Sequence, residues 1–256
     1  MFALQDHRPT GRSPLHFRRI ELKFLLPNRL IPAFVDRISP YTDLDPYLVE
    51  EGRGRTQYPV TSLYFDSADL HSLYEKEAGL LSRRKVRLRT YEEEFSPNAY
   101  SFIEIKRRHD FIVSKDRLSL SIGQLNDSLP MSGLLDHLLK RVEATEEVTH
   151  EAHVLQGWYN LQPTVLVTYH RMPFVGMQDE RFRITIDTDL RSVWKPSTFL
   201  GSHLYALCTP GYSVMEIKSN HALPAWFHDI ILDFQLTRTA HSKYSLSVEN
   251  LRLRWT

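Results

Sequence analysis

Residues 83–117 read RRKVRLRTYEEEFSPNAYSFIEIKRRHDFIVSKDR and carry the clearest structural signal in the chain. Three runs of alternating character, RRKVRLRT, SFIEIKRRHD and FIVSKDRLSL, are separated by two turns, and each run predicts a β-strand. Side chains two apart in a strand share a face, so Val86 and Leu88 lie on one face of the first run. The opposite face is entirely basic, with Arg83, Lys85, Arg87 and Arg89.

The next two runs repeat this division between an apolar and a charged face. Glu104 and Lys106 alternate with isoleucines in the second run, and Lys115 and Arg117 share a face in the third. Like charges lying side by side destabilise a sheet unless something neutralises them. The missing partner of this basic surface is therefore predicted to be an anion.

Composition sets the class of the protein. The chain has 256 residues, 42% of them hydrophobic, which suits one large domain or two small ones with a substantial core. A formal net charge of +1 does not argue for a nucleic-acid partner. The single cysteine, Cys208, can form neither an intramolecular disulfide nor a multi-cysteine metal site, and is expected to be a small buried residue in a cytoplasmic protein.

The domain organisation is expected to be simple. Residues 1–14 lack the apolar core of a signal peptide and predict a flexible tail, and residues 15–256 are predicted to form one domain. The longest stretch without Lys, Arg, Asp or Glu, residues 196–215, is broken by Pro, Gly and Ser, so no transmembrane segment is expected in this chain.

The remaining sequence predicts further strands and helices. Alternation of apolar and charged residues predicts strands at 17–27, 58–65, 163–174, 180–190 and 212–218. Helices are predicted at 27–38, from 66 to 75, within 120–158 and at 223–232. Tyr169 shares a strand face with Arg171, and Arg183 shares one with Asp187.

An antiparallel β-barrel satisfies these strands together. Its outside would be packed by helices, and its interior would hold the charged faces, which gives an α+β fold. Burying so much positive charge unpaired would be prohibitive, so the interior is expected to be wet and to bind a polyanion. Carboxylates available as counter-charges or metal ligands are Glu21, Glu104, Asp187 and Glu216.

A family resemblance follows from short motifs in order along the chain. They are Glu21-x-Lys23, YPVTSLYFDS, Tyr74-Glu75-Lys76, Lys85-x-Arg87-x-Arg89, Glu104-x-Lys106, Ser114-Lys115-x-Arg117, Tyr169-x-Arg171, Arg183-Ile-Thr-Ile-Asp187, Glu216-x-Lys218 and Ser242-Lys243-Tyr244. Over about residues 15–250 the set resembles the VTC domain, the polyphosphate polymerase domain of the vacuolar transporter chaperone family within the CYTH or triphosphate tunnel metalloenzyme superfamily.

The resemblance and the charged strand faces together predict roles for individual residues. The residues expected to be catalytic are Arg87, Arg89, Lys106, Arg171 and Arg183. Those expected to bind phosphate are Lys23, Lys85, Lys115, Arg117, Tyr169, Lys218, Ser242 and Lys243. A divalent metal, Mn²⁺ or Mg²⁺, is expected on Glu216 and Glu21.

The resemblance also implies a reaction, the transfer of the γ-phosphate of ATP to a growing inorganic polyphosphate chain. Hydrolytic relatives open with Glu-x-Glu-x-Lys, whereas this chain has Arg19, Glu21 and Lys23 at those positions, which favours transfer over hydrolysis. A tunnel triphosphatase and a non-catalytic polyphosphate or inositol-phosphate sensor stay open as alternatives. A membrane protein that exports the product is a possible partner, which would place the domain at the cytoplasmic face of a membrane.

Overall fold

The computed structural model describes residues 20–50, 54–94, 99–110, 112–121, 131–141, 147–220, 222–240 and 242–252. The predicted tail at 1–14 and the position of Arg19 lie outside these ranges.

The three central strands form as predicted. They are β4 (Ser82–Thr90), β5 (Tyr100–His109) and β6 (Ile112–Ser121), and consecutive strands pair antiparallel. The register places Arg87 opposite Glu104 and Lys106 opposite both Lys85 and Lys115. Arg87, Glu104, Lys106 and their charged neighbours therefore share one face. The other face carries Leu88 and Ile103, although charged residues such as Arg107 also lie on it.

The other strands extend this unit into one large antiparallel sheet. They are β1 (Ile20–Pro27), β2 (Thr42–Leu44), β3 (Tyr58–Asp66), β7 (Gln162–Gly176), β8 (Arg183–Trp194), β9 (Ala206–Leu207), β10 (Tyr212–Ser219) and β11 (Thr237–Arg238). The hydrogen-bonded order is β11-β1-β10-β8-β7-β3-β4-β5-β6, with β2 beside β7 and β9 beside β8.

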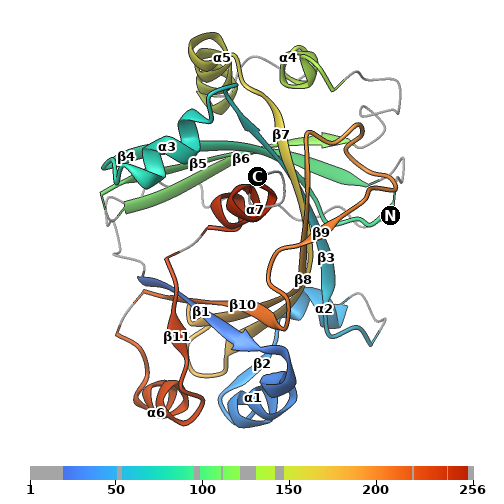
Figure 1. The fold of residues 1–256 in the computed structure, drawn as a ribbon. Helices are drawn as coiled ribbons and strands as arrows, with labels where there is room; N and C mark the ends of the chain where they lie inside the picture. The colour runs from blue at the N-terminus through green and yellow to red at the C-terminus, as the bar shows by residue number, and fades with distance from the viewer. Residues whose placement is uncertain are drawn as a thin grey trace.

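This sheet is strongly curved (Figure 1). Strands β4–β6 lie across from β1 and β10, and the long strands β3, β7 and β8 connect the two halves. The predicted α+β class and antiparallel arrangement are confirmed. The ladder of the described strands ends at β6 and at β11, so these two strands are the edges of the sheet.

Seven α-helices and one 3₁₀ helix accompany the described strands. They are η1 (Asn28–Leu30), α1 (Ile31–Ile38), α2 (Pro46–Glu50), α3 (His71–Glu77), α4 (Leu134–Leu139), α5 (Glu147–Tyr159), α6 (Ala225–Asp233) and α7 (Lys243–Arg252). No helix in the described ranges has the length and hydropathy needed to cross a membrane.

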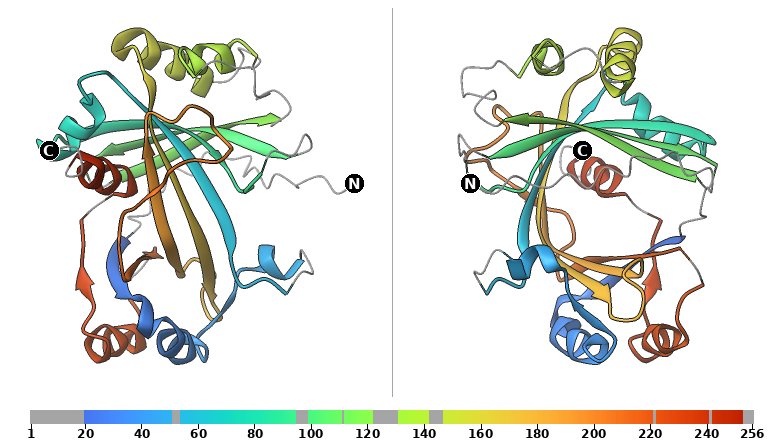
Figure 2. Two further views of the ribbon diagram at one scale, coloured as in Figure 1. Left: turned by 45° about the vertical axis from the view of Figure 1, so that its right-hand side comes forward. Right: turned by 180° about the vertical axis from the view of Figure 1, so that it is seen from behind.

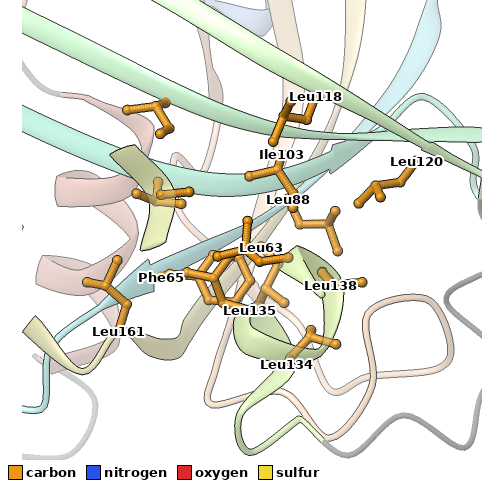
Figure 3. Packing of buried hydrophobic residues seen from close by; sticks show 14 of the residues in the cluster. Leu63, Phe65, Leu88, Ile103, Leu118, Leu120, Leu134, Leu135, Leu138 and Leu161 are labelled. Atoms are coloured by element: carbon orange, nitrogen blue, oxygen red, sulfur yellow. The ribbon is translucent and has the colours of Figure 1, made fainter. Parts of the chain in front are cut away.

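The convex face of the sheet buries two hydrophobic clusters. Helices α4 and α5 cover β4–β6, where Leu135 and Leu138 pack with Leu63, Leu88 and other apolar residues (Figure 3). Helices α1 and α6 cover the opposite half of the molecule, as two further views show (Figure 2). These helices lie on the outside, as predicted.

The helix α7 is an exception, because it lies on the concave face (Figure 1). Its Tyr244, Val248 and Leu251 pack in one cluster with Val165 and Val167 of β7. The concave face is apolar there, so a helix with apolar residues at this spacing can be buried against it. The expectation that all helices pack outside is therefore wrong for α7.

Candidate functional site

The concave face of the sheet encloses a cavity of about 480 Å³ between β4–β6, β1, β10 and the start of α7. Its wall combines nine cationic side chains with two carboxylates. The predicted site residues in this wall are Glu21, Lys23, Lys85, Arg87, Arg89, Lys106, Lys115, Tyr169, Arg171, Glu216, Lys218, Ser242 and Lys243. Strands distant in sequence thus bring almost the whole predicted set together.

Glu104 organises the cations of β4–β6 from beneath the wall. It is fully buried, and its carboxylate accepts from Arg87 at 2.7 Å and from Lys115 at 2.8 Å, with Arg89 at 3.7 Å. Burial alone would raise the pKa of Glu104, but Arg87, Arg89 and Lys115 hold it well below its usual range. Glu104 is therefore the expected counter-charge, fixed as an anion.

Asp187 has the same role on β8. Arg171 donates to its two oxygens at 2.7 and 2.8 Å, and Lys243 from α7 also pairs with it. Burial acts against the charge of Arg171, but Asp187 raises the arginine pKa well above its usual value. The Tyr169 hydroxyl lies 3.4 Å from both Arg89 and Arg171 and so links the two groups.

Two carboxylates remain in the cavity wall as candidate metal ligands. Glu216 lies 2.9 Å from Lys218, and Glu21 lies 3.6 Å from Lys106. Burial opposes ionisation of Glu216, yet Lys218 and a side-chain hydrogen bond with Glu21 hold its pKa well below the usual range. Among the residues that the structure describes, no three His, Cys, Asp or Glu side chains form a metal cluster.

This pair nevertheless fits a divalent metal of the Mg²⁺ type. Such an ion is commonly held by one or two carboxylates and completes its coordination with substrate phosphates and water. Glu21 and Glu216 are close enough for a side-chain hydrogen bond to form between them, which places carboxylate oxygens where one cation can meet both.

Lys85 lies in the cavity wall beside the start of α7. Its ammonium donates to Ser242 at 3.2 Å and lies 4.7 Å from the centre of the Tyr244 ring. Burial is the main cause that lowers the pKa of Lys85 to about 7; Asp66 opposes the shift and Lys106 adds to it. A group of this kind can gain a proton when a phosphate enters.

Two predicted residues do not reach the cavity wall. Arg117 lies on the edge strand β6, where its guanidinium stacks at 4.8 Å over the ring of Phe102. Arg183 is the first residue of β8; its side chain is 50% exposed and lies 3.6 Å from Asp45. Strand alternation places Arg183 on the expected face, but its position at the strand end directs it away from the site.

Residues that were not among the predicted site residues complete the wall. Tyr64 accepts from Arg87 at 3.1 Å, and although burial acts in the opposite direction, Arg87 and Arg89 lower the pKa of its hydroxyl. Tyr91 lines the cavity just beyond Arg89, and Tyr244 lines it from α7. Tyr91 could have been found from sequence, because it continues the alternation of Arg87 and Arg89 by one more step.

Comparison with known proteins identifies the family of this chain. The family model described as the VTC domain matches residues 18–252. Subunit 4 of the vacuolar transporter chaperone complex of Trypanosoma cruzi is 24% identical to this chain over an alignment 274 residues long. The alignment covers 92% of this chain. The match spans 34% of the length of that relative.

Solved structures give weaker likenesses. A candidate adenylate cyclase from Bacillus halodurans aligns over 88% of this chain and 93% of its own, with 16% identity and a TM-score of 0.49. A candidate adenylyl cyclase from Hippeastrum with a dominant triphosphatase activity aligns over 90% of this chain and 95% of its own, with 15% identity and a TM-score of 0.48. Likeness at this level does not bear on function.

The family match covers nearly the whole chain and contains every residue of the charged cavity. This protein therefore belongs to the VTC domain family.

Proposed function

We propose that this chain is a polyphosphate polymerase, which transfers the γ-phosphate of ATP to a growing inorganic polyphosphate chain inside the cavity. The observation that carries the proposal is the charge of the wall, where nine cations face two carboxylates. Glu104 and Asp187 beneath the wall still leave cations in excess by nine to four. An anion of several charges supplies the missing balance.

The chemistry asks for little beyond positioning and charge neutralisation. A terminal phosphate oxygen of the polyphosphate chain attacks the γ-phosphorus of ATP. The bond from that phosphorus to the β–γ bridging oxygen breaks, and ADP leaves. No protein nucleophile takes part in this transfer.

Arginines and lysines would hold the reacting phosphates in line. A guanidinium carries five N–H donors, so Arg171 keeps donors for phosphate while Asp187 fixes its plane. Glu104 holds Arg87, whereas Arg89 donates to Ser62 at 3.0 Å and lies 3.7 Å from Glu104. Lys106 adds a point charge. Fixed donors of this kind stabilise charge in the transition state without reorganising.

Glu21 and Glu216 would hold the divalent metal, Mn²⁺ or Mg²⁺, beside the phosphates. When bound, such an ion neutralises phosphate oxygens and orients the transferring group. The two carboxylates themselves would also keep Lys106 and Lys218 in place.

The relative from Trypanosoma cruzi is named as a subunit of a complex. By extension, this chain would work with a membrane protein that exports the polymer, at the cytoplasmic face of the membrane.

The test is a stoichiometric assay of the purified protein with ATP and Mn²⁺ or Mg²⁺. We expect ADP to appear in step with acid-insoluble polyphosphate, with little free phosphate, and EDTA to stop both. Lys106→Met should lower the rate about a hundredfold or more, because it removes a charge at the transferring phosphate. Arg191→Met is the matched control, since Arg191 lies outside the cavity wall and pairs with Asp189.

Two results would contradict the proposal. ADP with an equal amount of free phosphate and no polymer, even after priming with short polyphosphate, would make the protein a triphosphatase. Tight phosphate binding without any ADP would make it a sensor.

A further inference from the structure

The cavity wall changes character along strand β4. Lys85, Arg87, Arg89 and Tyr91 follow one another on the same face and all line the cavity. At about 3.3 Å per residue this row spans about 20 Å. One end of the row is therefore an ammonium group and the other is an aromatic ring.

Tyr91 belongs to a chain of rings at its end of the cavity. The ring centres of Tyr91 and Tyr58 are 5.7 Å apart, those of Tyr91 and Phe102 are 6.1 Å apart, and Tyr47 contacts Tyr58 at 5.9 Å. All three contacts are edge-to-face, and Tyr91 is only half-buried. The surrounding rings thus fix the position of Tyr91 without covering it completely.

The charges outside the two ends are opposite in sign. The three residues after Tyr91 are glutamates, Glu92, Glu93 and Glu94, and all are exposed. The lysine end holds Lys23 and Lys106 close to Lys85, and Lys218 beside Glu216. Arg117, over the ring of Phe102, offsets only one of the three glutamates. A long polyanion is therefore favoured at the second end over the first.

Because in-line transfer puts the leaving and attacking oxygens on opposite sides of the γ-phosphorus, the two substrates must enter from opposite ends. We infer that the nucleoside of ATP binds at the aromatic end, with its base against Tyr91, and that the polyphosphate chain leaves by the lysine end. This inference rests on the proposed function. Arg89 lies next inward from Tyr91 along the same face, and Arg171 pairs directly with Tyr58 across β3 and β7. The triphosphate would begin at these two arginines.

Photolabelling of the unmodified protein tests the orientation directly. ATP carrying an azide on its base would be bound, irradiated, and the labelled peptide identified by mass spectrometry. We expect the label on the segment that contains Tyr91 or on the one that contains Tyr58, and we expect excess tripolyphosphate to abolish it. A label on the segments of Lys23, Lys85 or Lys218 would overturn the inference.

Binding to two Tyr91 variants gives an independent test. Removal of a stacking ring weakens base binding, so Tyr91→Leu should weaken ATP about tenfold. The same variant should bind inorganic tripolyphosphate within about twofold of the unmodified protein, because that ligand has no base. Tyr91→Phe keeps the ring and should bind ATP normally. An equal loss of both ligands in Tyr91→Leu would contradict the subsite, and if that variant does not fold, the photolabel decides.

Both readouts measure binding and need no turnover. A polymer-forming enzyme with the label at its lysine end would leave the proposed function intact and refute this orientation. A protein that hydrolyses ATP without making polymer and carries the label on Tyr91 would refute the proposed function and leave the nucleoside site intact.

Discussion

Two buried carboxylates allow this sheet to carry a dense set of cations. Glu104 and Asp187 are both fully buried, and each pairs with an arginine and a lysine. Without them the burial of Arg87 and Arg171 would be very unfavourable. They also fix each guanidinium plane, so the site is preorganised before any phosphate arrives.

Lys85 should couple phosphate binding to proton uptake. Its pKa is about 7 because burial disfavours the ammonium ion, and a bound phosphate would restore the ordinary charge. Tripolyphosphate should therefore bind more tightly at pH 6 than at pH 8.5, with uptake of a proton near pH 8. Calorimetry in buffers of different ionisation enthalpy measures that uptake.

Lys85→Arg is the matched control, because it keeps the charge and does not titrate in this range. It should bind tripolyphosphate at both pH values without the uptake assigned to Lys85. Equal proton uptake by the variant and the unmodified protein would contradict this prediction.

The lowered pKa of Lys85 also determines how the free energy of unfolding depends on pH. Between pH 7 and 10.5 the unfolded chain holds a proton on Lys85 that the folded protein lacks. The contribution of Lys85 to the free energy of unfolding therefore rises with pH across this window.

At this scale the sequence predicts which side chains share the cavity but not which of them are neutralised. Alternation in β4 and β5 is enough to place Arg87 and Lys106 on one face. The pairing of Asp187 with Lys243 depends on α7 reaching the concave face, which strand alternation cannot reveal. Arg183 shows the limit of strand alternation. Alternation places it on the predicted face of β8, but at the end of the strand its side chain lies near Asp45 and outside the cavity.

Among the elements, α7 links the core to the site. Its first residue, Lys243, pairs with Asp187, while Tyr244 donates a hydrogen bond to the fully buried Asp66 at the end of β3. Asp66 also accepts from the backbone N–H groups of Ser67 and Ser72. The start of α7 is thus fixed to β3 and α3.

Removal of that anchor should destabilise the protein. Tyr244→Phe leaves one oxygen of a buried carboxylate without its donor, so the free energy of unfolding should fall by about 2 kcal/mol. Denaturant unfolding measures the change. Tyr74→Phe is the control, because Tyr74 is 63% exposed and the change should stay within about 0.5 kcal/mol. Equal stabilities of the two variants would show that the bond to Asp66 is not an anchor.

The sequence predicts β4, β5 and β6 well because each strand has one apolar and one charged face. The sequence does not predict α7. The apolar residues of this helix, Tyr244, Val248 and Leu251, are separated by polar residues such as Ser245 and Glu249, so their helical spacing is difficult to recognise. That spacing is the available signal, and it is weak over a single helix of ten residues.

The molecule as a whole separates its tasks between the two faces of one curved sheet. Helices α1, α4, α5 and α6 cover the convex face with apolar clusters, whereas the concave face carries the charged cavity and the cluster under α7. The sequence predicts this division, since every strand carries both faces. The curvature and the order of the strands arise from pairings between distant segments, such as β1 with β10, which no local pattern specifies.

A crystal structure with tripolyphosphate would show whether the concave cavity is the phosphate site. We predict phosphate density inside the cavity, in contact with Arg89, Lys106 and Arg171. A second cleft on the convex face, lined by Arg84, Arg107 and Trp158 among others, is the natural competitor. Density confined to that cleft, with the concave cavity empty of phosphate, would contradict the account.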